Sequence, residues 1–304
     1  MFNSSVSSFS YGFEVPDELL ITESKGINMH NLAIYFSCSV RKKEIDMLVS
    51  KMKQYDLQVI VIDLPDDYCL HEMGDVIALT DDASFAGECS NRGIPYLFLL
   101  YEKNKQESLP SGTYCVENLV DVSYDYLDKV YRRAKGLPWN ILTTDRLQIR
   151  EITPEDVPRL YELYEEESIT RYMEPLFPDQ QQEIDYTKDY IKNVYHFYGY
   201  GMWLIILKES GEIIGRAGLE YKEGFEGLEL GFMLGKDYQH KGYAYESCKA
   251  ILDYACEELE QTSFRAIVHR NNEPSRHLCE KLGFQKKEST EETQYLEYRM
   301  NRAL

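Results

Sequence analysis

Residues 228–244 read LELGFMLGKDYQHKGYA, and this stretch decides the fold of the second half of the 304-residue chain. Its first part, Leu228–Leu234, is short and apolar, has glycine on both sides and carries Glu229 as its only charge, which predicts a buried strand. Apolar residues then recur at helical spacing from Ala244 to Leu259, which predicts an amphipathic helix. Residues 239–244 are therefore expected to form a tight loop that leaves a strand and begins a helix.

This loop has the properties of an anion-binding site. The first backbone N–H groups of a helix have no internal partner, and they lie at the positive end of the helix dipole. Small residues at Gly242 and Ala244 allow an anion to approach those N–H groups. A Walker loop is excluded by the spacing of Gly235 and Gly242, and a dinucleotide fingerprint is excluded because only Gly242 fits it. The loop thus predicts a phosphate or pyrophosphate site.

The loop and its flanks resemble the coenzyme A pyrophosphate loop of the GNAT acyltransferase superfamily. The shared pattern, Gln/Arg-x-x-Gly-x-Gly/Ala, is met by residues 239–244. The flanks that match are Glu229-Leu230-Gly231-Phe232-Met233-Leu234, Asn272-Glu273-Pro274-Ser275 and Cys279-Glu280-Lys281-Leu282-Gly283-Phe284. The sequence is most similar to the branch that includes the ribosomal-protein N-terminal acetyltransferases, over roughly residues 142–304. The resemblance implies an acyl-CoA-dependent N-acyltransferase, with acetyl-CoA as acyl donor and a protein N-terminus, a polyamine or another small amine as acceptor.

The resemblance also implies which residues bind the donor. In this family the fourth strand separates from the fifth, and pantetheine lies in the gap between them. Met233 and Leu234 would then offer backbone groups to pantetheine, and Asn272 would bond its amides. The residues expected to hold the pyrophosphate are Gln239, His240, Lys241, Gly242, Tyr243 and Ala244. For Lys241 the alternative is an ordinary solvated lysine, and no metal or nucleotide cofactor is implied.

Two residues are the candidates for proton transfer. Glu229 is the leading general base, because partial burial in an apolar strand disfavours its charged form; Glu220 is the reserve. The alternative for Glu229 is a structural ion pair or an outward-facing strand acid. Ser275 is the candidate proton donor to the leaving thiolate, and its alternative role is the N-cap of a helix over 276–282. Many family members carry a tyrosine where this chain has Cys279, so the tyrosine-acid mechanism of the family is in doubt here.

The residues before Gly136-Leu137-Pro138 predict a separate α/β domain, 1–139, without catalysis, followed by the acyltransferase domain 140–304. In this first domain buried apolar runs alternate with helical segments, which predicts a parallel sheet with helices on both faces, a three-layer fold. The expected strands are 32–36, 59–62, 76–79, 94–101 and 114–119, and the expected helices are 42–55, 81–92 with Thr80 as N-cap, and 123–135.

The segments Thr80-Asp81-Asp82 and Gly93-Ile94-Pro95 faintly resemble the haloacid-dehalogenase-like fold. The nucleophile pattern of that fold, Asp-x-Asp after a strand, is absent, since Asp63 is followed by Leu64-Pro65. Phosphatase chemistry then lacks its first step. Asp81 and Asp82 are instead interpreted as acids in the first turn of a capped helix.

The second domain is expected to begin with a strand over 147–152 and a helix that starts at Thr153-Pro154, with Thr153 as N-cap. A second helix is expected over 181–198, and its Tyr186, Tyr190, Tyr195 and His196 either line a substrate cleft or pack against the core. Two strands, 203–207 and 212–220, are expected to form a hairpin around Ser210-Gly211.

The net charge of −19 argues against binding to nucleic acid or to anionic membranes. It favours cationic amine substrates weakly, with solubility as the alternative explanation. The seven cysteines have no Cys-x-x-Cys spacing, which excludes a disulfide framework and a zinc site, and no signal peptide or membrane span is evident. A cytoplasmic enzyme is expected; a catalytically weak CoA-binding sensor and a scaffold are the alternatives.

Overall fold

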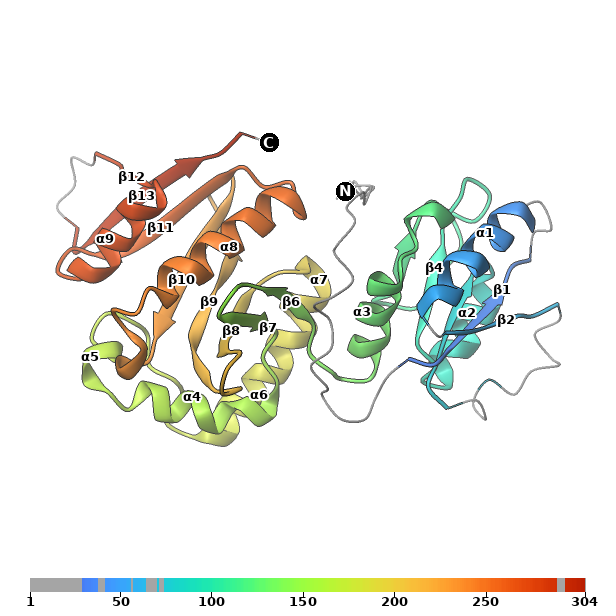
Figure 1. The fold of residues 1–304 in the computed structure, drawn as a ribbon, viewed down its shortest axis with the longest axis horizontal. Helices are drawn as coiled ribbons and strands as arrows, with labels where there is room; N and C mark the ends of the chain where they lie inside the picture. Colours follow the sequence, from blue (N-terminus) through green and yellow to red (C-terminus); the bar gives the residue numbers. More distant parts are fainter. Residues whose placement is uncertain are drawn as a thin grey trace. The chain divides into compact units, whose positions relative to one another are not determined.

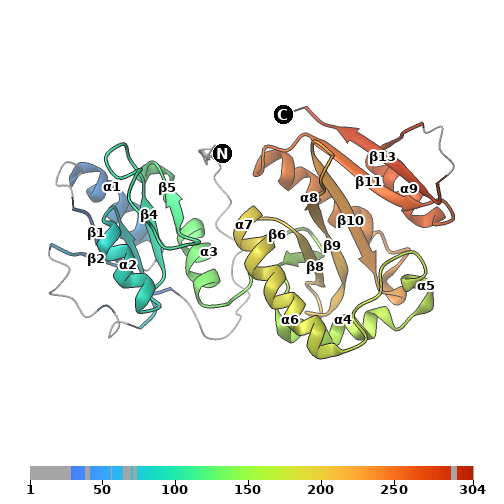
Figure 2. The same cartoon turned by 180° about the vertical axis from the view of Figure 1, so that it is seen from behind.

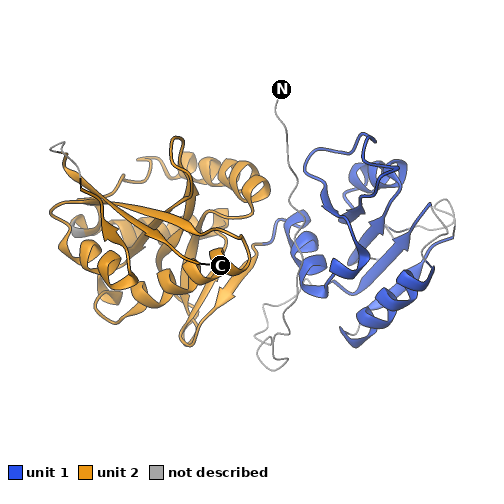
Figure 3. Cartoon of the chain, turned by 90° about the horizontal axis from the view of Figure 1, so that it is seen from above, with its two compact units in different colours: residues 1–137 blue, residues 138–304 orange. Residues whose placement is uncertain are grey.

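The computed structural model describes residues 29–37, 42–55, 57–63, 70, 74–288 and 293–303. The chain divides into two compact units, residues 1–137 and 138–304, which Figure 3 colours separately. The sequence predicted that the first domain ends at Trp139, but Trp139 belongs to the second unit. Its backbone N–H donates to the carboxylate of buried Glu151 at 3.0 Å. Cys38, Cys69 and Leu64-Pro65 lie outside the described residues.

The first unit is a three-layer α/β domain, as predicted. Its strands and helices are β1 Asn31–Tyr35, α1 Lys42–Met52, β2 Gln58–Val61, β3 Val76–Thr80, α2 Ala83–Asn91, β4 Tyr96–Leu99, β5 Tyr114–Val116 and α3 Tyr124–Ala134. Short 3-10 turns cover Lys53–Tyr55 and Leu119–Asp121. The sheet order is β2-β1-β3-β4-β5, and every neighbouring pair is parallel.

Helices cover both faces of this parallel sheet, which explains its nearly continuous apolar strands. On one face Leu48 of α1 and Leu127 of α3 pack with the strand residues Ile34 and Leu79. On the other face Phe85 of α2 packs with Ala33 and other buried residues. Residues that alternate along β1 therefore enter two different cores, as the two-residue period of a strand requires.

The start of α2 differs from the sequence prediction. Its N-cap is Asp82, whose carboxylate accepts from the Phe85 N–H at 2.8 Å; Thr80 is the last residue of β3. Asp81 lies before the helix and accepts hydrogen bonds from the backbone N–H and the hydroxyl of Ser37, at 2.7 and 3.1 Å. A carboxylate caps a helix only from the residue with extended backbone that precedes it, and Asp82 holds that place.

The second unit is built on a mixed sheet in the order β12-β13-β11-β10-β9-β8-β7-β6. Its strands are β6 Asn140–Thr143, β7 Leu147–Arg150, β8 Met202–Leu207, β9 Ile213–Tyr221, β10 Leu228–Leu234, β11 Ser263–His269, β12 Gln285–Lys286 and β13 Tyr295–Asn301. Its helical elements are η6 Pro154–Asp156, α4 Val157–Tyr164, α5 Glu167–Thr170, α6 Gln180–Tyr190, η7 Ile191–Tyr195, α7 His196–Tyr198, η8 Lys236–Tyr238, α8 Tyr243–Glu257 and α9 Glu273–Leu282. The sheet is antiparallel except at β10 and β11, which run parallel.

Helix α8 lies on one face of this sheet and α6 on the other (Figures 1 and 2). The apolar stripe predicted for α8 is confirmed, since Cys248, Ile251, Leu252 and Ala255 are buried. Trp203 of β8 is fully buried and meets Tyr254 of α8 edge-on, with ring centroids 5.9 Å apart. This packing holds the helix against the strands, so the loop before α8 has a rigid support.

The helix expected over 181–198 is present, but a π-helical segment, Ile191–Tyr195, interrupts it between α6 and α7. Tyr195 is fully buried and accepts from the Ile152 N–H, and its hydroxyl donates to the Met202 carbonyl. Tyr190 is also buried, and its hydroxyl accepts from the Met202 N–H at 2.8 Å. For these two tyrosines the packing alternative holds, and the cleft interpretation is wrong.

We expect a fragment of residues 138–304 to fold without the first unit. The backbone of Trp139 pairs with residue 151 in both directions, and Thr153 and Asp156 form the predicted capping box, all within this fragment. A fragment that begins at Asn140 loses the Trp139 donor to the buried Glu151 carboxylate, which costs about 1–3 kcal/mol. Thermal unfolding followed by circular dichroism compares the two. An insoluble 138–304 fragment would show that the first unit completes the core of the second.

Candidate active site

The central feature of the second unit is a separation between its two parallel strands. β10 and β11 have seven residues each, all described, yet they pair only at Leu228↔Phe264 and Glu229↔Arg265. On its other side β10 pairs with β9 along its whole length, from Leu228 to Leu234. The second half of β10 therefore pairs with a strand on its β9 side only. On its β11 side there is an opening in the hydrogen-bond ladder, where its backbone groups have no strand partner. Met233 and Leu234 lie in this half, with buried side chains.

The loop that follows β10 is held in place by its own first residue. The side-chain amide of Gln239 donates to the Leu234 carbonyl at 3.1 Å, which ties the loop to the end of the strand. His240 adopts a left-handed backbone conformation with φ of 60°. Gln239 thus has a structural contact, while His240 and Lys241 are exposed.

Gly242 is the N-cap of α8, and its φ of 85° lies in the left-handed region that favours glycine. Gly242 has no side chain with which to cap the helix. The N–H groups of the first turn, beginning at Tyr243 and Ala244, therefore receive no hydrogen bond from an N-cap side chain. The predicted combination of a small residue, a tight turn and a helix N-terminus is thus present. That it binds pyrophosphate stays a prediction.

Asn272 and Ser275 lie where β11 ends and α9 begins. Asn272 is the N-cap of α9, and its side-chain oxygen accepts from the Ser275 N–H at 3.3 Å. The N-cap alternative for Ser275 is therefore wrong, because Ser275 is the third residue of the helix and Asn272 caps it. The roles of Asn272 toward pantetheine and of Ser275 as proton donor stay predictions.

Glu229 makes the ion pair that the sequence left open as an alternative. Its carboxylate accepts from Arg265 Nε at 2.8 Å, and both side chains are about 20% exposed. Arg265 also lies over the Phe225 ring, 4.8 Å from its centroid. Glu229 is thus partly buried and reachable by water, but one of its oxygens is bound to a guanidinium.

Glu220, the reserve base, pairs with Lys222 at 2.9 Å. This hydrogen bond raises the pKa of Lys222; burial opposes the rise, and the nearby carboxylates of Glu229 and Glu174 support it. Glu220 and Glu229 are cross-strand partners on β9 and β10. The two candidate bases, Glu220 and Glu229, therefore lie side by side at the closed end of the opening, which is the end where β10 and β11 still pair.

Cys279, the position at which the resemblance implies a tyrosine in many family members, is fully buried. Burial raises the pKa of its thiol to about 12, with a smaller contribution from Glu280. A buried thiol of this kind remains protonated at neutral pH and is poorly placed to exchange protons with a ligand.

Two contacts at the site were not foreseen from the sequence. Tyr172 stacks on His269 at the end of β11, with centroids 4.9 Å apart, and its hydroxyl donates to the Asn271 carbonyl at 3.3 Å. Arg146, in the turn between β6 and β7, donates to the Lys241 carbonyl at 3.0 Å. Neither residue belongs to a motif or a periodic pattern, so the sequence offers no local signal for them.

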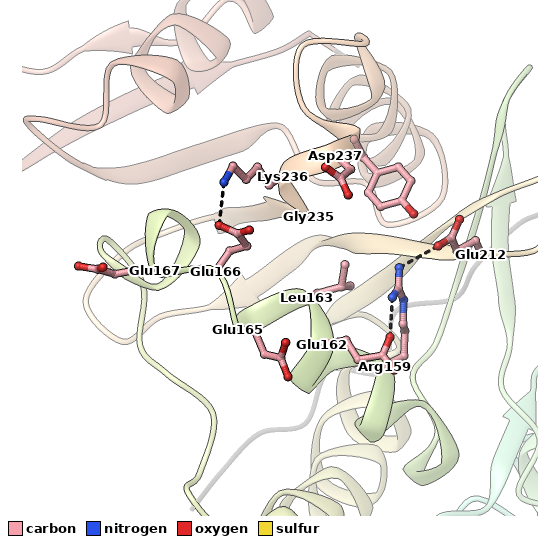
Figure 4. A pocket seen from close by; sticks show the side chains of 11 residues that line it. Arg159, Glu162, Leu163, Glu165, Glu166, Glu167, Glu212, Gly235, Lys236 and Asp237 are labelled. Carbon is pink, nitrogen blue, oxygen red and sulfur yellow. Dashed lines mark hydrogen bonds and ion pairs between the residues drawn. The ribbon is translucent and has the colours of Figure 1, made fainter.

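A pocket of about 550 Å³ lies beside the segment that joins β10 to the loop (Figure 4). Six carboxylates line it: Glu162, Glu165, Glu166, Glu167, Glu212 and Asp237. Arg159 pairs with Glu162 and Glu212, at 2.6 and 3.0 Å, and Lys236 pairs with Glu166 at 3.0 Å. The excess of negative charge in this pocket repels phosphate groups, so phosphate groups fit the neighbouring loop, residues 239–244, better.

Metal-binding clusters and membrane-spanning helices are both absent from the part of the chain that the structure describes. Within the described ranges no group of three or more His, Cys, Asp or Glu side chains is arranged to hold a metal ion. None of the helices in those ranges has the length and apolar character needed to cross a bilayer.

Comparison with known proteins places the second unit in a family. The family model for the acetyltransferase (GNAT) domain matches residues 146–285. The uncharacterized N-acetyltransferase p20 of Bacillus licheniformis is 31% identical over 150 residues, which cover 48% of this chain and 82% of that protein. The ribosomal protein uS5-alanine N-acetyltransferase of Escherichia coli (strain K12) is 27% identical over 153 residues, 48% of this chain and 78% of that protein.

Among solved structures, an acetyltransferase from Agrobacterium tumefaciens str. C58 has a TM-score of 0.45 and 26% identity, and covers 53% of this chain and 94% of that one. The haloacid-dehalogenase-like resemblance of the first unit is not shown by any of these matches and stays a prediction. Given the family match and the 31% identity to p20, the chain belongs to the GNAT acetyltransferase family.

Proposed function

We propose that the second unit transfers an acetyl group from acetyl-CoA to a primary amine. The observation that carries the proposal is that β10 and β11 pair at two positions only, on the strand that precedes the loop and the N-terminus of α8, which has no side-chain cap. An extended chain such as pantetheine fits beside a strand edge with accessible backbone groups, and a pyrophosphate fits a helix N-terminus. The residues proposed to hold the donor are those of the loop 239–244 together with Met233, Leu234 and Asn272.

The reaction requires a direct displacement at the thioester carbonyl. The amine nitrogen forms a bond to the carbonyl carbon, the carbon–sulfur bond breaks, the amine loses a proton and the thiolate gains one. Glu229 is proposed to accept the amine proton, directly or through water, since it lies at the closed end of the opening. Ser275, in the first turn of α9, is proposed to supply the proton to sulfur.

The acceptor is proposed to be a protein N-terminus, a polyamine or another small amine. The uS5-alanine N-acetyltransferase among the relatives supports the first of these. The net charge of −19 weakly supports a cationic ammonium in any of the three cases. The first unit is proposed to have no catalytic role.

The proposal is tested by incubating the full chain with acetyl-CoA and a panel of amines: a peptide with an N-terminal alanine, a polyamine and small primary amines. Amine-dependent release of free thiol, with an acetylated product in the mass spectrum, is the expected result. CoA binding without thiol release from any amine would instead favour the alternative, a CoA-binding sensor, which the buried Cys279 thiol motivates. Absence of CoA binding would refute both.

A further inference from the structure

The turn between β6 and β7 packs against the loop 239–244 through one arginine. Arg146 Nη1 donates to the Lys241 carbonyl at 3.0 Å, and Arg146 Nε donates to Glu246 Oε2 at 2.7 Å. Its Nη2 lies 2.5 Å from the same carboxylate oxygen. The guanidinium also lies over the Tyr243 ring, 4.5 Å from the centroid. Arg146 therefore contacts the loop and the first turn of α8 at the same time.

Glu246 orients this guanidinium, and its own position is secured from the same turn. Its Oε1 accepts from the Thr144 hydroxyl at 2.6 Å and from the Arg146 backbone N–H at 3.1 Å. Burial opposes ionisation of Glu246, but the hydrogen bonds from Thr144 and Arg146 outweigh it and lower the pKa of this carboxyl. The carboxylate is thus charged at neutral pH, and the arrangement with Arg146 is present under physiological conditions.

Arg146 keeps unused hydrogen-bonding capacity that faces the loop. A guanidinium has five N–H groups. The contacts above use one on each nitrogen, which among the described residues leaves one on Nη1 and one on Nη2. The Arg146 side chain is 47% exposed, and a Cβ placed on Gly242 would lie 3.3 Å from Nη2. The two remaining donors are therefore beside the residue that opens α8, and a ligand can reach them.

We propose that Arg146 is a phosphate-contact residue: Glu246 and the Lys241 carbonyl hold its guanidinium beside Gly242, where it donates to the pyrophosphate of CoA. This inference rests on the proposed function and assigns to Arg146 the charge that the sequence had assigned to Lys241. Backbone N–H groups offer only partial charge, whereas a guanidinium adds a full charge and the planar fork that suits phosphate. The Lys241 ammonium lies instead toward the Tyr238 ring, 5.7 Å from its centroid.

The chain offers a matched control on the same helix. Arg302 pairs with Asp253 of α8 at 2.6 Å, as Arg146 pairs with Glu246, but Asp253 lies two turns further along the helix, away from the loop. Arg302→Ala therefore removes a similar ion pair to α8 without changing the charge near Gly242. Any general effect of a loosened α8 appears in both variants. Arg146→Ala also removes the contact to the Lys241 carbonyl, and the salt dependence of CoA binding separates that packing loss from the loss of a phosphate contact.

Calorimetric titration of the full chain with CoA tests the inference. We expect Arg146→Ala to weaken CoA binding by about 10–100-fold and Arg302→Ala to change it by less than about threefold. Glu246→Gln, which keeps the guanidinium but removes the charge that orients it, should give an intermediate loss. Binding to Arg146→Ala should also depend less on salt concentration, because one phosphate contact is lost; a role limited to packing would not change the salt dependence.

The failure of this inference is distinguishable from failure of the proposed function. If the wild-type chain binds CoA and Arg146→Ala binds it with the same affinity, the role of Arg146 is overturned and the acetyltransferase proposal stands. The same holds if Arg146→Ala and Arg302→Ala lose equal affinity. A wild-type chain that does not bind CoA would overturn both. Thermal unfolding of each variant checks that the fold is retained, and Arg146→Lys, which keeps the charge but loses the planar fork, should restore only part of the affinity.

Discussion

The substitution Gly242→Glu is expected to abolish binding of CoA, with a loss of affinity greater than about 100-fold. The new carboxylate would stand at the N-terminus of α8, where phosphate oxygens are proposed to approach, and like charges repel there. Its Cβ would lie 3.3 Å from Arg146 Nη2, so the carboxylate would also engage the guanidinium that we assign to the phosphate. Calorimetry with CoA measures the loss directly.

Backbone strain is the confounding effect in this experiment, because Gly242 has a φ of 85°. Gly211→Glu controls for it: Gly211 has a φ of 74° and lies in the hairpin between β8 and β9, and a Cβ added there would have no heavy atom of the described residues within 4 Å. Gly242→Ala adds the strain at the site itself without the charge, and should lose much less affinity than Gly242→Glu. Unchanged CoA affinity in Gly242→Glu would mean that the loop does not bind the pyrophosphate.

Glu229→Gln is expected to lower kcat by about 10²–10⁴, the usual contribution of a general base, with little change in CoA binding. The acidic limb of the pH–rate profile should disappear in this variant, because the amide that replaces the carboxylate does not titrate. An alkaline dependence that comes from the ammonium of the acceptor can remain. Steady-state kinetics across a pH series measures both quantities.

The ion pair with Arg265 supplies a control for this prediction. If Glu229 serves only to pair with Arg265, then Arg265→Gln and Glu229→Gln should destabilise the fold similarly and neither should change kcat much. If Glu229 is the base, Arg265→Gln should keep most of kcat, because the carboxylate that accepts the proton is still present. Near-normal kcat and an unshifted acidic limb in Glu229→Gln would transfer the role to Glu220 or to another proton path.

Patterns within one element allowed the local structure to be predicted. The run Leu228–Leu234 is short, apolar and flanked by glycine, which indicated a strand. The stripe on α8 has the helical period, which indicated a helix, and both elements are present. The alternating segments of the first unit indicated a three-layer parallel fold for the same reason. The cap of α2 was misplaced by two residues because Thr80, Asp81 and Asp82 are all suitable capping residues, and only the backbone conformation selects Asp82.

Strand β13 was not predicted, because charged and apolar residues are mixed along Tyr295–Asn301 and the strand is recognised by its pairing with β11. The roles of Tyr190 and Tyr195 could likewise not be predicted from neighbours along the chain. A tyrosine at helical spacing suits a cleft and a core equally well, and the Met202 backbone groups that bond both hydroxyls come from another element.

By itself the sequence determined the elements that have a regular apolar pattern, the loop with glycine at the start of α8, and the resemblance from which the family followed. Each of these depends on neighbours along the chain. The tertiary structure alone decided which charges meet. Arg146 and Glu246 are 100 residues apart in sequence, and Glu229 and Arg265 are 36 apart. Pairs at such separations are brought together by the order of strands in the sheet, which no local pattern records. The candidate base and the arginine beside the loop therefore acquire their partners only when the sheet has formed.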